Sequence, residues 1–257
     1  MYNGHSGIFK KVIKMGVGSA KIQQQDMRKR ERGSALVYIL IAIALLAALT
    51  LSFMEPSGQQ TQSQNTFKTI SEIESQAEYI RTAIQECVIL HEKGDNTIDN
   101  SPTGSDPGAN KKFPIKPTST HFTGATPPAD ADDFVEYLRC PGNPGDDQDH
   151  KRIFTAETGK FLPPPPPLFE KWEYYNGDDG IFFWTHTTKS DSYLQTALAK
   201  LEEKFGKCEA DTIVAGGSAV DLDTDGSVEC PANSTCFRVW MTIKGSPTVF
   251  QEAGCPN

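Results

Sequence analysis

The sequence lacks the short motifs that mark the common enzyme classes. It contains no glycine-rich phosphate loop, no dinucleotide-binding fingerprint and no G-x-S-x-G turn around a nucleophile. No two carboxylates form a pair in a context that supports acid–base catalysis, and the five histidines are scattered along the chain. We therefore expect that the protein is not an enzyme.

Basic residues are scarce after the first 33 positions. Residues 1–33 hold eight of the 25 Lys and Arg and only two of the 33 acidic residues, a net charge of +6. The remaining 17 basic and 31 acidic residues give residues 34–257 a net charge of −14. Because nucleic-acid phosphates require a basic binding surface, we expect no nucleic-acid partner.

Charge is absent from the twenty residues between Ser34 and Phe53. A helix of this length covers the ~30 Å hydrocarbon core of a bilayer, whereas the apolar part of a secretory signal has about 7–15 residues. Four basic residues precede the run and favour a cytoplasmic N-terminal side: Arg28, Lys29, Arg30 and Arg32. We predict a retained anchor over residues 34–54, in contact with membrane lipid, with the rest of the chain exported.

Cysteine is absent from the first 86 residues, so all six cysteines fall in the exported part. They form no C-x-x-C pair, and no histidine stands near them at a zinc-ligand spacing. We expect disulfides rather than buried free thiols, with these candidates: Cys87, Cys140, Cys208, Cys230, Cys236 and Cys255. The six allow 15 pairings; a short Cys230–Cys236 loop is one option, and Cys208 and Cys255 bracket the last third of the chain.

Apolar residues recur every three or four positions after a polar stretch at 57–66. Such spacing predicts one face of a helix, which we place over residues 57–92. The stripe consists of Phe67, Ile70, Ile73, Ala77, Ile80, Ala83, Ile84, Cys87 and Val88. This helix must bury its stripe against the downstream chain, residues 93–257, which we expect to form an exported, disulfide-containing head.

The head contains both helical and strand patterns. Residues 94–133 are rich in Gly, Pro, Ser, Thr, Asp and Asn and predict a long or loosely ordered loop, and 134–141 predict a short helix or strand. Aromatic runs around Asn176-Gly177-Asp178-Asp179-Gly180 predict a hairpin over 171–187. Residues 192–206 predict an amphipathic helix, and the alternation in 235–245 predicts a half-buried strand. The fold class is α+β, with the long N-terminal helix packed on a small antiparallel sheet and one additional short helix.

This order of elements resembles a type IV pilin or a type II secretion pseudopilin. Within the cytoplasmic basic leader 1–33, the matching residues are Arg28, Lys29, Arg30 and Arg32, followed by Gly33 before the scissile bond. Ser34 as the new N-terminus and the run to Phe53 also match, and an amphipathic half-helix follows. The resemblance implies cleavage after Gly33 by a prepilin peptidase, methylation of Ser34, an N-terminal helix that contacts other pilin subunits, and a bacterial inner-membrane location with the head in the periplasm or on a fibre. Residues 1–26 fit such a leader poorly, and Met27 is a more natural start.

Two positions depart from the family pattern. Members usually have Phe or Met after the glycine and a glutamate at the fifth mature position, whereas this chain has Ser34 and Tyr38 there. Absence of that glutamate resembles the minor subunit at the fibre tip, which has no neighbour above it. The sequence thus favours a minor, tip-located subunit, and the alternative is a membrane-tethered binding or adaptor protein that never polymerises.

An acidic segment, VDLDTDGSVEC at 220–230, resembles the opening of a calcium-binding loop. Carboxylates alternate before a glycine that permits a sharp turn, and the predicted ligands are Asp221, Asp223, Asp225 and Glu229. The twelfth position of an EF-hand loop is Ala232 here, so a full EF-hand is excluded. The sequence leaves open a looser calcium loop or a solvated acidic turn.

Two further segments have compositions that occur in binding sites. Pro163 to Pro167 predict a stiff polyproline spacer rather than a ligand. The acidic stretch ending at Asp149-His150 could bind a metal, but we expect a solvated loop there.

Overall fold

The computed structural model describes residues 35–51, 57–96, 98, 110–122, 132–141, 150–177, 180–206, 208–222 and 228–243. The chain divides into two compact units, Met1–Gln59 and Gln60–Asn257.

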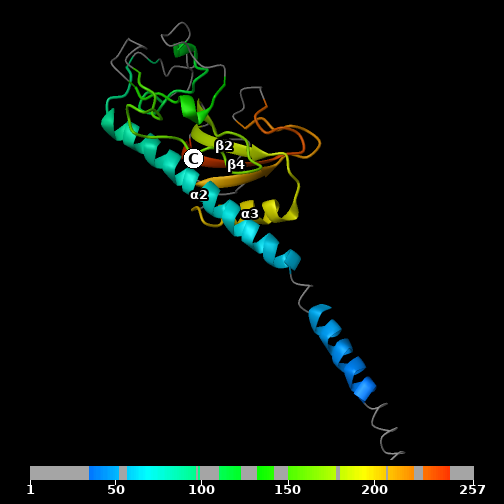
Figure 1. Cartoon of the computed structure of the whole chain (residues 1–257). Coiled ribbons are helices and arrows are strands. Elements are labelled where there is room, and N and C mark those ends of the chain that lie inside the picture. The colour runs from blue at the N-terminus through cyan, green and yellow to red at the C-terminus, as the bar shows by residue number, and fades with distance from the viewer. Residues whose placement is uncertain are drawn as a thin grey trace, which may run out of the picture. The chain divides into compact units, whose positions relative to one another are not determined.

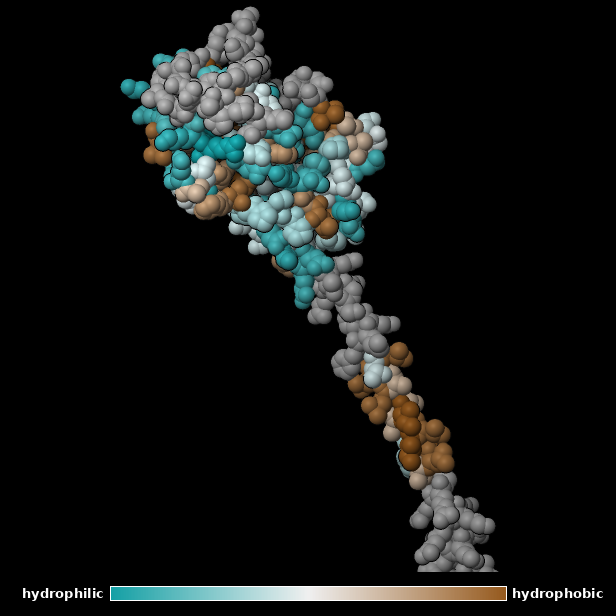
Figure 2. Space-filling view, turned by 45° about the horizontal axis from the view of Figure 1, so that its top comes forward, coloured by the Kyte–Doolittle hydropathy of each residue, from teal (hydrophilic) through white to brown (hydrophobic). Residues whose placement is uncertain are grey.

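The first unit contains a helix over residues 35–51. Its eleven large apolar side chains are each 50–70% exposed, and Figure 2 shows apolar side chains along the visible face of this helix. In the described part of the chain, no helix combines the length and the apolar character needed to cross a membrane. Ser34 and residues 52–54, which belong to the expected anchor, lie outside the described residues.

The second unit is an α+β head built on a four-stranded antiparallel sheet in the order β1-β2-β4-β3 (Figure 1). The strands are β1 (Glu173–Gly177), β2 (Gly180–Thr187), β3 (Ala210–Val214) and β4 (Thr235–Ile243). The helices are α2 (Ser57–Leu90) and α3 (Ser192–Glu202), with the short 3₁₀ turns η1 (Thr120–Phe122) and η2 (Val135–Tyr137). The predicted α+β class, the β1-β2 hairpin and the short helix α3 are confirmed, whereas β3 was not predicted.

One face of the sheet is covered by both helices. The predicted stripe of α2 is buried from Ile70 to Cys87 and joins Leu198 of α3 in one core with sheet residues such as Phe183 and Val239. Figure 1 shows α2 running along this side of the sheet. Ile73, Ile80 and Ile84 are fully buried, so the second half of the amphipathic pattern marks the helix face that packs on the sheet. Phe67, the first residue of the predicted stripe, is instead exposed.

The opposite face of the sheet is also buried, which corrects the prediction of a half-buried strand at 235–245. The first six residues of β4 are all buried. The chain between β3 and β4 folds over this face and contributes Ala215, Leu222 and Cys230 to a second core around Trp184 and Trp240. In a strand with one buried and one exposed face, Arg238 would point to solvent. It is buried instead, because it pairs with buried Asp211 on β3.

The described part of the 94–133 segment is packed rather than loosely ordered. Ile98, Ile115 and Phe122 form a small core of their own. The sequence suggested loose order because apolar residues are sparse there, yet these three come together, and Asp95 beside them is fully buried. This region also carries two members of a buried polar cluster, Asp95 and His121.

Candidate functional site

Three side chains from distant parts of the head converge at a buried point. Oδ2 of Asp95 lies 2.7 Å from Nε2 of His150 and 3.3 Å from Nε2 of His121. The three candidate ligand atoms all lie within 4.8 Å of one another. The side chains of Asp95 and His150 are inaccessible to solvent, and that of His121 is 12% exposed. Two imidazoles and one carboxylate are a donor set that suits a divalent transition metal.

Asp95 is positioned by a glycine that turns the chain just after α2. Gly94 has a φ of +61°, and its N–H donates to the carbonyl of His91 at 2.8 Å. A Cβ at Gly94 would lie 2.2 Å from the carbonyl oxygen of Lys111, which in turn accepts a hydrogen bond from the N–H of Asp95 at 2.9 Å. Only glycine satisfies both the left-handed backbone and this close approach.

His121 is held by the η1 turn. Its N–H donates to Oγ of Ser119 at 3.2 Å, and the next N–H, from Phe122, donates to the Ser119 carbonyl at 3.0 Å. The Phe122 ring stands edge-on to both imidazoles, at centroid distances of 5.3 Å from His121 and 5.5 Å from His150. The ring therefore limits the directions in which the two imidazoles can turn.

His150 is fixed through the backbone around it. Its carbonyl accepts a hydrogen bond from Nη1 of buried Arg139 at 3.3 Å, and the N–H of Cys140 donates to the carbonyl of Lys151 at 2.9 Å. Cys140 is disulfide-bonded to Cys87 in the last turn of α2, with 5.7 Å between the Cα atoms. This disulfide thus links the helix that precedes Asp95 with the backbone that pairs beside His150.

Sequence reasoning did not find this cluster. Its members are 26 and 29 positions apart, at 95, 121 and 150, and no motif has such spacings. The expectation of a solvated loop at His150 is wrong for that residue, which is 2% exposed because the 138–153 and 110–122 segments enclose it. Asp146, Asp147 and Asp149 lie outside the described residues.

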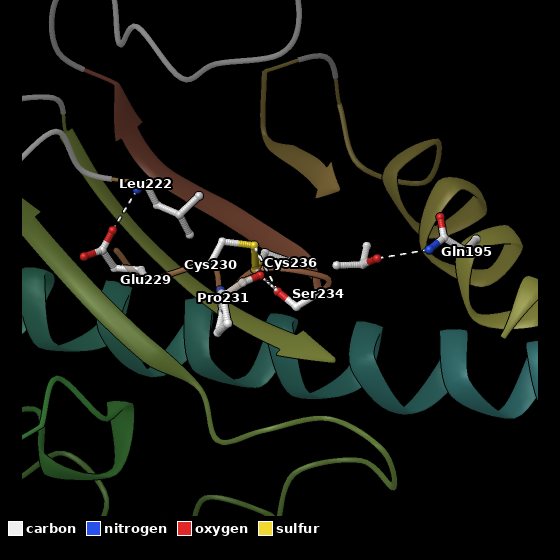
Figure 3. Close-up of a disulfide and its surroundings, with 8 residues drawn as sticks. Gln195, Leu222, Glu229, Cys230, Pro231, Ser234 and Cys236 are labelled. Carbon is white, nitrogen blue, oxygen red and sulfur yellow. Dashed lines mark hydrogen bonds between the residues drawn. A yellow bond between two sulfur atoms is a disulfide. The ribbon is translucent and has the colours of Figure 1, made fainter. Parts of the chain in front are cut away.

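The predicted calcium loop is described only at its two ends. Asp221 and Glu229 are described, whereas Asp223 and Asp225 lie outside the described residues. Val220 and Cys230 exchange two backbone hydrogen bonds of 2.8 and 3.0 Å that close the base of the loop. Oε2 of Glu229 accepts a hydrogen bond from the N–H of Leu222 at 2.7 Å (Figure 3). One oxygen of Glu229 therefore serves the loop itself, and calcium binding stays a prediction.

The cysteines of the described chain are paired. Cys230 bonds to Cys236 over a six-residue separation, and Figure 3 shows the bond beside Pro231 and Ser234. Cys208 is also disulfide-bonded, and Cys255 lies outside the described residues. In the described part of the chain no free cysteine remains, in agreement with the disulfides expected from the sequence.

The polyproline stretch packs on α2 through one glutamine. Nε2 of Gln76 donates to the carbonyl of Pro164 at 2.7 Å, and Oε1 of Gln76 accepts from Nε1 of buried Trp172 at 2.8 Å. The predicted processing residues Gly33 and Ser34 lie outside the described residues.

Comparison of the chain with protein-family models, with curated proteins and with solved structures gives no match in any of the three.

Proposed function

We propose that the protein is a minor pilin-like or pseudopilin-like structural subunit, anchored in the bacterial inner membrane by its N-terminal helix and displaying its head at the tip of a fibre. A prepilin peptidase processes it after Gly33, and other pilin subunits contact its N-terminal helix. No catalytic role is assigned to it.

The helix over residues 35–51 is the observation that carries this proposal. Its large apolar side chains are at least half exposed on every side, from Leu36 to Leu51. An all-round apolar helix is stable only when lipid or other helices cover it, because exposed apolar surface costs about 25 cal/mol for each Å². Lipid covers such a helix while it anchors the protein in the membrane, and neighbouring helices cover it once it lies in a fibre core.

The head supports the proposal through its order of elements. An amphipathic helix, α2, precedes the sheet and buries its stripe on it, as the resemblance implies. The paired cysteines suit an oxidising compartment outside the cytoplasm. The uncharged Tyr38 at the place of the family's glutamate favours a tip position over a repeated position along the fibre.

Substituting two helix leucines tests the proposal. Leu45→Lys with Leu46→Lys places two charges where the anchor requires apolar side chains, and each costs about 2.5–3.5 kcal/mol at a membrane centre. Leu90→Lys is the matched control, because Leu90 is similarly exposed, at 69%, but lies in the head. We expect wild type and the control in the membrane and sheared-fibre fractions of the native host, and loss of the double variant from both.

The membrane and sheared-fibre fractions also distinguish a fibre subunit from a membrane-tethered protein that never polymerises. Wild-type protein in the membrane but never in sheared fibres would favour the tethered binding or adaptor protein instead. Wild-type protein that washes off membranes would contradict both.

A further inference from the structure

We propose that Asp95, His121 and His150 bind a zinc ion that clamps three segments of the head together. The inference is independent of the pilin-like function, since it rests only on side chains within the head. Its donors are Oδ2 of Asp95 and Nε2 of each histidine, and they come from the turn after α2, from η1 and from the segment that pairs with 138–140.

The spacing of the donor atoms is close to that required by a tetrahedral ion. Zinc bonds of about 2.0–2.1 Å to imidazole and carboxylate place neighbouring ligand atoms about 3.3 Å apart. The His121–Asp95 pair already has this separation, at 3.3 Å, and the His150–Asp95 pair, at 2.7 Å, needs to open by only a few tenths of an ångström. The candidate ligand nitrogens of His121 and His150 lie within 4.8 Å of each other, so a small movement of the imidazoles lets both reach one ion.

Burial distinguishes this cluster from a surface group of polar residues. The Asp95 carboxylate is inaccessible to solvent. An ionised carboxylate in such a place must be compensated, because it has lost its hydration by water. A divalent cation held by two neutral imidazoles supplies that compensation, while the alternative is a triad of hydrogen bonds alone.

The donor types favour a transition metal such as zinc over calcium or magnesium. Calcium and magnesium prefer oxygen ligands, whereas imidazole suits zinc, copper, iron and nickel. Zinc has no redox chemistry and adopts a tetrahedral site with histidine and carboxylate ligands, and three protein ligands leave its fourth position for water or another donor. The Cys87–Cys140 disulfide restrains two of the three ligand-bearing segments, so the ligands are partly organised before the metal arrives.

Metal content of the purified full chain tests the proposal. The protein is stripped with chelator in detergent, dialysed against zinc and measured by elemental mass spectrometry, with cobalt(II) as a spectroscopic probe. His121→Gln removes the least buried ligand, and His91→Gln is the matched control, three residues before Gly94 and outside the cluster. We expect one zinc per wild-type chain, a tetrahedral cobalt spectrum, and unchanged binding in the control.

Loss of an outer-shell partner typically lowers metal affinity about 10–100-fold. Since His121→Gln removes a direct ligand, we expect its zinc affinity to fall further than that. Asp221→Asn with Glu229→Gln should bind zinc like wild type, which separates this site from the predicted calcium loop. If His121→Gln fails to fold, the zinc stoichiometry and the cobalt spectrum of the wild-type protein still test whether the site binds metal. Folded wild-type protein with intact disulfides and no stoichiometric zinc overturns the proposal and leaves a hydrogen-bonded triad.

Discussion

The buried ion pair between Asp211 and Arg238 offers the sharpest test of the head's interior. Both side chains are inaccessible to solvent and face each other across β3 and β4. Nε and Nη2 of Arg238 donate to the two carboxylate oxygens at 2.9 and 2.6 Å, and Nη1 donates to the carbonyl of Leu222 at 2.8 Å. One guanidinium therefore joins two strands and the chain that covers them.

Asp211→Asn keeps the shape of the side chain but removes the negative charge. The remaining Arg238 charge is then buried without its carboxylate partner, although the Leu222 carbonyl and the rings of Phe182 and Trp240, at 5.0 and 4.5 Å, still lie beside it. Breaking such a pair costs about 3–5 kcal/mol. For a domain of 150–250 residues each kcal/mol lowers the melting temperature by about 2–4 °C, so we expect a loss of about 6–20 °C.

Thermal unfolding of the full chain in detergent, followed by near-ultraviolet circular dichroism, measures this loss. Glu136→Gln is the matched control, because Lys171 and Glu136 also approach to 2.6 Å but with side chains 48% and 34% exposed. That exposed pair should contribute at most about 1 kcal/mol. Asp211→Leu with Arg238→Met removes both charges and should recover most of the stability. An Asp211→Asn melting curve that matches the Glu136→Gln curve would refute the reasoning.

Two further predictions concern the acidic groups near the second face of the sheet. Burial, and then the nearby charges of Asp133 and Glu229, raise the pKa of Glu173 from 4.5 to about 7. Between pH 4.5 and 7 the folded state therefore keeps a proton on Glu173 that the unfolded state has released, and this proton stabilises the folded state. The stabilisation by protonated Glu173 is complete below pH 4.5 and is lost as the pH rises through 7. Glu173→Gln should flatten that part of the stability profile in pH-dependent melts and stabilise the head above pH 7; a profile unchanged by the substitution contradicts the assignment. For the predicted calcium loop, millimolar calcium should raise the melting temperature, by the equivalent of about 2.7 kcal/mol at a hundredfold excess over Kd, and Asp223→Asn with Asp225→Asn should abolish the response. A wild-type melting curve that chelator leaves unmoved means that the segment is only an acidic turn.

Local patterns in the sequence predicted much of the head's architecture. The turn residues between two aromatic runs identified the β1-β2 hairpin, whose register closes at Gly177 and Gly180. The apolar stripe of α2 identified the buried helix face, since a period of three to four residues can be read without knowing the partner. These elements depend on neighbours in the sequence, and for that reason they could be predicted.

Features that depend on distant contacts could not be predicted. Arg238 stands at an outward position of a simple alternating strand, and only the chain from 215 to 230, folded over that face, makes the position buried. The Asp95, His121 and His150 cluster depends on the turn at Gly94, on η1 and on backbone pairing beside Cys140. A glycine after the end of a helix and three isolated ionisable residues gave no signal that they would meet.

The mature N-terminus tests the pilin-like function most directly. Intact-mass analysis of the protein extracted from membranes of its native host should show a chain that begins at Ser34, with one added methyl group, and Gly33→Leu should leave the leader in place. A native chain that still carries the residues just before Ser34 would contradict the pilin-like function and favour an unprocessed, membrane-tethered protein.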